Sequence, residues 1–173
     1  MAKLGSWKYG KAVREEDSVS KTNFIPEGYS ELTPHLIVKG AAAAIDYYKK
    51  AFGAELVLRM DQPDGRVGHA EMRIGKAYIM LADEFPETDI VGPQSLGGAG
   101  VSLLIYVPDV DRVFRQAVDA GAKVDREVKD QFYGDRSGNV VDPFGHKWTI
   151  ATHVEDVSPE EMKRRAEAAV QTT

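Results

Sequence analysis

The sequence predicts an α+β fold built from two successive βαβββ modules, one over residues 28–89 and one over residues 101–155. Two observations support this prediction. The order of one strand, one helix and three strands can be followed twice along the chain, and the helix ends "AFGA" (51–54) and "DAGA" (119–122) match at a spacing of 68 residues. A module of this kind leaves one face of its sheet open, so it needs its twin to bury that face.

The first module begins with a predicted strand at residues 31–38. Residues 41–53 place apolar side chains at helical spacing, and a glycine is typical of the position just after a helix. Pro and Asp-Gly turn signals follow the next strand. The three remaining strands are predicted at 54–60, 67–75 and 77–84.

A Gly-rich linker is predicted at residues 90–100, before the second module. The helix at 109–122 carries its apolar residues on one face. The four strands of this module are predicted at 101–107, 123–131, 133–142 and 146–153.

Two flanking segments complete the chain. Residues 1–27 are polar without clear periodicity and are predicted to form an N-terminal arm. Residues 156–173 are predicted to hold a closing helix and tail, in which Ser158 is the N-cap and Glu161 completes a capping box.

Composition excludes several classes of protein. The chain of 173 residues contains no cysteine, which excludes disulfides, thiol nucleophiles and cysteine metal sites. The net charge of −5 argues against nucleic acid or an anionic membrane as the partner. No apolar run approaches the ~20 residues of a membrane span, and the N-terminus lacks an apolar signal core, so a cytoplasmic location is expected.

Two segments carry a family resemblance: "IPEGYSELTPHLIVKGAAAAIDYYKKAFGAE" (25–55) and "DQFYGDRSGNVVDPFGHKWTIATHVEDVSPEEM" (130–162). Together with the repeated module they resemble the vicinal oxygen chelate superfamily of glyoxalase I, bleomycin-resistance proteins and extradiol dioxygenases. Within it the chain looks most like the PhnB-like branch. The resemblance implies paired half-barrel sheets, a pocket on each concave face, and a homodimer that completes the barrels.

The resemblance also locates the positions that hold a metal ion elsewhere in this superfamily, where histidine and glutamate are the typical ligands. In this chain those positions fall on Thr33, Met80, Ser102 and Thr149. Neutral hydroxyls and a thioether do not replace the hydration of a divalent cation. We therefore expect no metal and no cofactor, and no glyoxalase I, metal-dependent dioxygenase or fosfomycin-type chemistry.

Strand alternation predicts which side chains face the cavity. Leu32, Leu36 and Val38 are expected on the face that packs against the helix. The opposite faces combine apolar and aromatic walls with polar groups, a composition that suits a small, partly aromatic organic molecule. The predicted ligand-binding residues are Thr33, His35, His69, Glu71, Arg73, Tyr78, Met80, Ser102, Tyr106 and Thr149.

Three functions remain open from the sequence. The leading hypothesis is metal-free binding of a small organic molecule, for example sequestration of an aromatic or antibiotic-like ligand. The second is a lyase, isomerase or dioxygenase-like enzyme that uses a shifted site at His35, His69 and Glu71, with His69 and Glu71 as candidate catalytic groups. The family's strand order puts one strand between the two histidine strands, ~9–10 Å apart between backbones. The third is a protein-interaction module without a ligand.

The stretch 131–153 is rich in titratable residues, but we interpret it as structural. Asp135 and Arg136 are expected to form an ion pair at a strand edge, and Asp142 before Pro143 to form a turn. His146 is expected to bond the backbone and set that turn. His153 is expected near solvent at the strand end.

Overall fold

The computed structural model describes residues 22–170, which contain two four-stranded sheets. The strand order is β1-β4-β3-β2 in the first sheet and β5-β8-β7-β6 in the second. In each sheet the first strand pairs in parallel with the fourth, and the other pairs are antiparallel. This arrangement confirms the predicted α+β fold of two βαβββ modules.

The first module consists of β1 (His35–Val38), α1 (Ala41–Phe52), β2 (Glu55–Asp61), β3 (Val67–Ile74) and β4 (Ala77–Asp83). The connection that follows holds η1 (Pro86–Thr88) and α2 (Pro93–Leu96). The second module consists of β5 (Ser102–Tyr106), α3 (Val110–Asp119), β6 (Lys123–Asp130), β7 (Asp135–Val141) and β8 (Lys147–His153), and α4 (Pro159–Val170) closes the chain.

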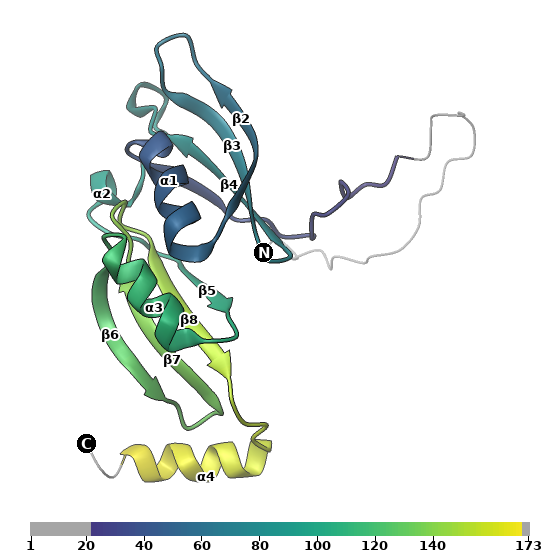
Figure 1. Cartoon of the computed structure of the whole chain (residues 1–173), viewed down its shortest axis with the longest axis vertical. Coiled ribbons are helices and arrows are strands. Elements are labelled where there is room, and N and C mark those ends of the chain that lie inside the picture. The colour runs from purple at the N-terminus through teal and green to yellow at the C-terminus, as the bar shows by residue number, and fades with distance from the viewer. Residues whose placement is uncertain (1–21, 171–173) are drawn as a thin grey trace, which may run out of the picture.

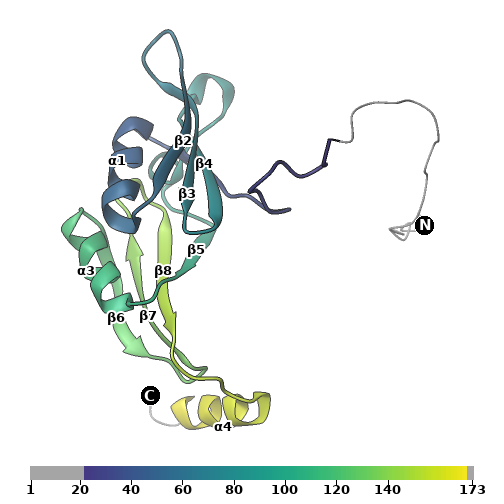
Figure 2. The same ribbon diagram turned by 45° about the vertical axis from the view of Figure 1, so that its right-hand side comes forward.

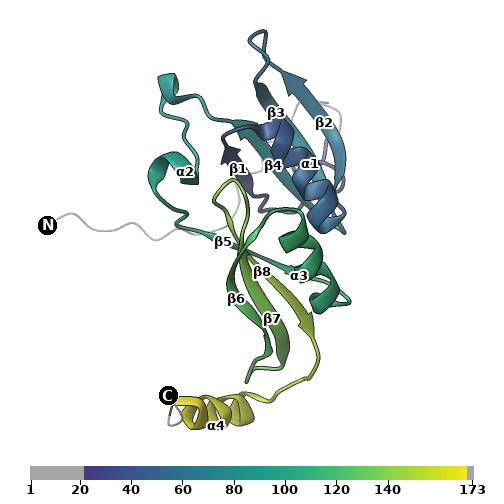
Figure 3. The same ribbon diagram turned by 60° about the vertical axis from the view of Figure 1, so that its left-hand side comes forward.

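The helices α1 and α3 lie together on one side of the molecule (Figure 1), where each covers one face of its own sheet. Figure 3 shows α1 of the first module directly above α3 of the second, so that the two helices meet at the junction of the modules. Gln116 of α3 joins them, because its side-chain amide donates hydrogen bonds to the backbone carbonyls of Lys50 and Ala51 at the end of α1. The opposite face of each sheet is left uncovered by helix; we call it the open face.

The same device begins both helices. Asp83 at the end of β4 accepts hydrogen bonds of 2.8 Å from the backbone N–H groups of Gly40 and Ala41. Thr152 on β8 accepts one of 2.9 Å from the N–H of Val110. These groups have no partner within the helix, so a side chain from the neighbouring strand both satisfies them and fixes the helix to its sheet.

The buried core crosses from one module to the other. Asp142 is buried and accepts hydrogen bonds from the hydroxyl of Tyr48 at 2.8 Å and from Nε1 of Trp148 at 2.9 Å. The ring of Phe52 packs on that of Trp148, with centroids 4.6 Å apart. A substitution in this group therefore affects both modules.

The first predicted strand is too long in the sequence-based assignment. β1 begins at His35, and Leu32 is 83% exposed instead of packing against α1. Pro34 has no N–H to donate and its ring restricts the backbone, so only its carbonyl takes part, accepting from the N–H of Met80. Leu36 and Val38 are buried as expected. The linker at 90–100 also differs, because Pro93 starts the short helix α2.

The predicted Asp135–Arg136 ion pair is wrong. Successive side chains of a strand point to opposite faces, so the two groups cannot meet. Arg136 pairs with Asp111 of α3 at 2.8 Å and with Asp130, whereas Asp135 accepts hydrogen bonds from Tyr106 and His153 on the other face.

The turn at Asp142 is confirmed, since its carboxylate accepts from the backbone N–H groups of Phe144 and His146. The ring of His146 does bond a backbone group, but that group is the carbonyl of Ile37 in the first module, 3.1 Å away. The side chain of His153 is 51% exposed at the end of β8, as expected.

The capping box of α4 is half formed. Ser158 accepts from the N–H of Glu161, but the Glu161 carboxylate pairs with Arg164 and Arg165 instead of returning to the Ser158 backbone. Over residues 22–170, no helix combines the length and apolar character that crossing a bilayer requires. Most of the arm predicted at residues 1–27 lies outside the described residues.

Candidate functional site

The open face of the first sheet gathers the ionisable groups that the sequence singled out. Met80 of β4 is the register partner of both His35 on β1 and Glu71 on β3, so it lies between them. His69 is two residues before Glu71 on β3 and therefore points to the same side. Three strands thus place two imidazoles, one carboxylate and one thioether beside each other.

The two histidines meet although a strand separates them. The order β1-β4-β3 agrees with the expected separation, yet the rings of His35 and His69 lie edge to face with centroids 5.9 Å apart. Nε2 of His69 is 3.2 Å from Oε1 of Glu71. The side chains thus bridge the distance between their backbones, and the shifted site forms one continuous polar group.

The surroundings lower the pKa values of two of these groups, His35 and Glu71. Partial desolvation lowers the pKa of His35, and the neighbouring His69 lowers it further. The contact with Tyr29 and then the one with His69 hold the pKa of Glu71 below its ordinary value, against a raising effect of burial. At neutral pH the face therefore presents an ionised carboxylate beside an uncharged imidazole at His35.

Tyr29 is a residue of this face that the sequence reasoning missed. It comes from the segment before β1, and its ring stacks on Tyr78 of β4 with centroids 4.4 Å apart and planes 28° from parallel. Figures 1 and 2 show this segment on the side of the first sheet opposite α1. The available signal was the Gly-Tyr pair at 28–29, a turn residue followed by an aromatic one.

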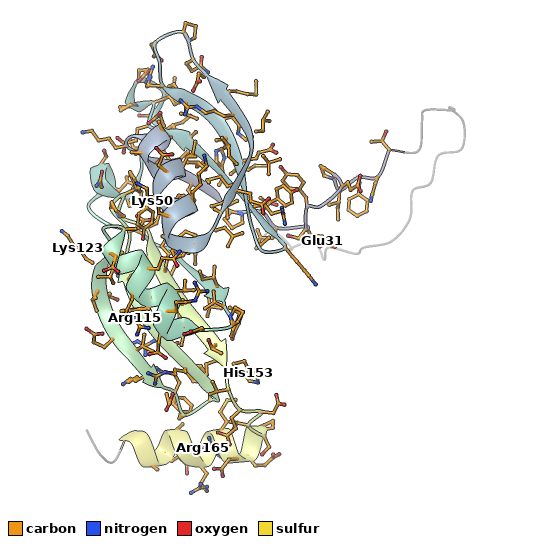
Figure 4. All side chains as sticks on the ribbon, in the orientation of Figure 1. Glu31, Lys50, Arg115, Lys123, His153 and Arg165 are labelled. Carbon is orange, nitrogen blue, oxygen red and sulfur yellow. The ribbon has the colours of Figure 1, made fainter. Side chains whose placement is uncertain are left out.

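Residues 24–33 also bound a cavity against the sheet. Its volume is about 620 Å³, within the range of small-molecule sites. Figure 4 shows Glu31 at the base of this segment, close to the first sheet. The lining residues are Phe24, Ile25, Pro26, Tyr29, Ser30, Glu31, Thr33, Glu71 and Met80.

Arg73 is turned to other partners. It forms an ion pair with Glu55 of β2 and donates a hydrogen bond to the carbonyl of Gly75. Its role as a contact for an anionic ligand stays a prediction.

The open face of the second sheet has a different chemistry. Asn139 accepts hydrogen bonds from the hydroxyl of Thr149 at 3.2 Å and from Arg126 at 3.0 Å, and Arg126 also donates to Ser137. The sequence reasoning did not single out Arg126 or Asn139, which lie in a strand pair with an irregular register. Ser102 and Tyr106 lie on the same face, on β5, and the Tyr106 hydroxyl donates to Asp135.

The four residues that the resemblance assigns to the metal-ligand positions have side chains that do not suit a divalent metal ion. Thr33 and Met80 belong to the first module, and Ser102 and Thr149 to the second. Their oxygens and sulfur are neutral and weak donors, and the Thr149 hydroxyl is engaged with Asn139. Across residues 22–170 no three His, Asp or Glu side chains are grouped so that they could hold a metal ion.

Comparison with known proteins agrees with this architecture. Residues 31–150 match the family described as the Glyoxalase/Bleomycin resistance protein/Dioxygenase superfamily. An uncharacterized protein of Mycobacterium tuberculosis is 40% identical over 92% of this chain and 94% of its own length. The crystal structure of TioX from Micromonospora is 28% identical, with a TM-score of 0.57 over 72% of this chain and 99% of TioX. The PhnB protein of Bacillus cereus, 18% identical, has the same fold, with a TM-score of 0.57 over 71% of this chain and 99% of its own. The chain therefore belongs to the glyoxalase/bleomycin resistance protein/dioxygenase superfamily.

Proposed function

We propose that this protein binds a small, partly aromatic organic molecule on the open face of its first sheet, without a metal ion and as a homodimer. The observation that carries the proposal is the contiguous group of His35, His69 and Glu71 beside Tyr78 and Met80. A few convergent polar groups on an apolar, aromatic wall are typical of a small-molecule site.

The electrostatics of the face favour a ligand that donates hydrogen bonds. Glu71 is held ionised and is only partly exposed, with 19% of its side chain accessible. An ionised carboxylate in a partly desolvated place accepts a strong hydrogen bond. Tyr78 adds an aromatic face on which a planar ring can stack.

Metal independence is supported by the donor set at the superfamily positions. A cation at Thr33 and Met80, or at Ser102 and Thr149, would exchange its water for neutral oxygens and a thioether. We therefore assign recognition to the protein's own side chains. Sequestration of an antibiotic-like aromatic compound is one concrete form of this function, in line with the bleomycin resistance proteins for which the superfamily is named.

Dimerisation is supported by apolar side chains on both open faces. Leu58 and Met60 of β2 are 41% and 58% exposed, and Leu104 and Tyr106 of β5 are 52% and 60% exposed. Apolar residues gathered on one face favour a protein contact, and a second copy would cover them. Light scattering after gel filtration should give twice the chain mass of 19.0 kDa, and Leu104→Glu should give the monomer. We propose the cytoplasm as the location of the protein.

The binding test is calorimetric titration with a panel of planar aromatic compounds, before and after treatment with a chelator. We expect saturable binding with an affinity that the chelator leaves unchanged. Absence of heat with every compound at millimolar concentration would contradict the binding function. Loss of binding after chelation, together with stoichiometric metal in the untreated protein, would contradict metal independence.

A second candidate, an enzyme that moves a proton, is favoured by one observation. His69 and Glu71, 3.2 Å apart, have the geometry of an acid–base pair, and the His35 ring lies against the His69 imidazole. A lyase or isomerase could use such a pair without an open metal site. Turnover of a panel compound that disappears in both His69→Ala and Glu71→Gln would favour the enzyme over the binding protein.

A further inference from the structure

We infer that the ligand of the first open face is a phenol, a planar aromatic ring with a hydroxyl group, and that Tyr29 occupies its place until it binds. This inference rests on the proposed function and names the class of ligand for that site. It follows from the way in which a side chain of the protein itself lies in the site.

The ring of Tyr29 occupies the stacking surface. It lies nearly parallel to the Tyr78 ring at a centroid distance of 4.4 Å, in the range of favourable stacked pairs. The backbone allows this approach at Gly28, where φ is +85° and an added Cβ would lie 3.0 Å from the Tyr78 ring. A non-glycine residue would be strained there and would push the stack apart.

The Tyr29 hydroxyl points toward the polar group. Its oxygen is shielded from solvent and meets no partner in full hydrogen-bond geometry among residues 22–170. It nevertheless interacts with Glu71: burial first, and then the contact with Glu71, raise the pKa of Tyr29 to about 12. The hydroxyl therefore stays protonated and can offer its proton to the carboxylate.

An imperfect contact of this kind can be exchanged for a better one. A buried hydroxyl without a well-aligned partner loses hydration without full compensation. A free phenol, which no backbone tethers, can stack on Tyr78 and align its hydroxyl with Glu71. Displacement is feasible because the segment that carries Tyr29 borders the cavity of about 620 Å³ and exposes Phe24 and Leu32 to solvent.

The chemistry of the site selects against related ligands. An aromatic ring without a hydroxyl would displace the Tyr29 hydroxyl from Glu71 and leave only the His69 contact in its place. A phenolate would place a second negative charge beside the Glu71 carboxylate. An aliphatic alcohol would lose the stacking contact with the Tyr78 ring. A neutral phenol supplies both the aromatic ring that stacks on Tyr78 and the hydroxyl that donates to Glu71.

The experiment uses 4-methylphenol, which has the ring and hydroxyl of the Tyr29 side chain, and two analogues. In 4-methylanisole the hydroxyl is capped, and in 4-methylcyclohexanol the ring is not aromatic. Calorimetry would measure the affinity of the full chain and of Tyr29→Ala, Tyr29→Phe, Tyr78→Leu and Glu27→Ala. Glu27→Ala is the matched control, since this exposed residue lies in the turn before Tyr29 and does not line the cavity.

We expect Tyr29→Ala to bind 4-methylphenol about tenfold more tightly than the full chain. This factor corresponds to a site that its own tyrosine fills about nine-tenths of the time. Tyr29→Phe keeps the stacked ring and should bind like the full chain, as should Glu27→Ala. Tyr78→Leu should lose binding, and both analogues should bind at least about tenfold more weakly than the phenol. Thermal unfolding of each variant checks that the fold is intact.

The possible results distinguish a failure of this inference from a failure of the proposed small-molecule binding function. Equal affinity of Tyr29→Ala and the full chain for the phenol would overturn the role of Tyr29. Equal binding of 4-methylphenol and 4-methylanisole would overturn the phenol class while leaving a small-molecule site in place. Failure of every aromatic compound to bind either protein would overturn the proposed function and this inference together.

Discussion

The two modules share a backbone frame but present different chemistry at matching register positions. The partner of Met80 on the neighbouring parallel strand is His35, and the corresponding partner of Thr149 is Leu104. On the other side Met80 faces Glu71, whereas Thr149 faces Asn139. At these positions the first open face carries an imidazole and a carboxylate, whereas the second carries a leucine and an amide.

This contrast indicates that the residues that build the fold and the residues that line the open faces vary independently of each other. Both modules start their helix with a side chain from the fourth strand, Asp83 in the first and Thr152 in the second. Neither residue lies on an open face, because both point toward the helix. The open-face side chains differ between the modules while the architecture stays the same.

The largest expected effect tests whether the two modules fold as one unit. Asp142→Ala would leave the buried Tyr48 hydroxyl, the Trp148 N–H and two backbone N–H groups without their acceptor. We expect a loss of about 3–5 kcal/mol in the free energy of unfolding, measured by urea denaturation. Asp130→Ala is the control, because its exposed ion pair with Arg136 contributes less than about 1 kcal/mol. Two separate unfolding transitions in the unsubstituted protein would contradict the shared core.

The next prediction compares the sheet faces that pack against α1 and α3. Gly138 of β7 stands at the register position that Ala70 has in β3. At Gly138 the ring of Phe114 fills the space that a Cβ would need. A Cβ added at Gly138 would lie 2.6 Å from the Phe114 ring, so Gly138→Ala should cost about 1–3 kcal/mol of stability. Adding Phe114→Leu should recover part of that loss. A fully additive double-mutant cycle would show that the ring does not set the glycine requirement.

A smaller effect tests which open face binds the ligand. His69→Ala should weaken binding of the best panel compound about tenfold, or ~1.4 kcal/mol, by removing a neighbour of Glu71. Ser137→Ala, at the matching position of the second sheet, should change it less than about threefold. Calorimetry on both variants measures the difference. Equal losses would place the ligand on both faces at once.

The smallest effect depends on pH and belongs to the second module. Both ring nitrogens of His153 face carboxylates, those of Asp135 and Asp156, and these contacts raise the pKa of His153. The stabilisation is therefore fully present below the ordinary value of 6.5 and is lost as the pH rises through the higher folded-state pKa. His153→Gln should lower the melting temperature more at pH 5.5 than at pH 9. The reverse order would show that the neutral ring is the stabilising form.

Much of the fold follows from the sequence alone. Apolar spacing and the two matching helix ends define both modules, because burial of one helix face leaves a periodic signal. The error at residues 31–34 has a physical cause: Leu32 continues the apolar alternation, but Pro34 prevents strand pairing before His35. The alternation of apolar residues does not show whether each residue can donate a backbone N–H to the neighbouring strand.

The site was only partly accessible to the same reasoning. Alternation put His35, His69 and Glu71 on one face, but strand order alone argued that His35 and His69 stay apart. Rotamers bring the rings to 5.9 Å, and no sequence period encodes them. Tyr29 could not be predicted either, because it reaches the open face from a segment without helix or strand, where no periodic pattern indicates the direction of a side chain.

The most direct test of the first open face as the ligand site uses the four histidines of the chain as reporters. His35 and His69 lie on the first sheet, whereas His146 and His153 belong to the second module. Imidazole resonances would be followed by NMR while the best compound of the aromatic panel is added to saturation. Shifts at His35 and His69, with His153 unchanged, are the predicted result; His146 bonds the carbonyl of Ile37 on β1 and is not used as the reference. Shifts confined to His146 and His153, or none at saturation, would contradict it.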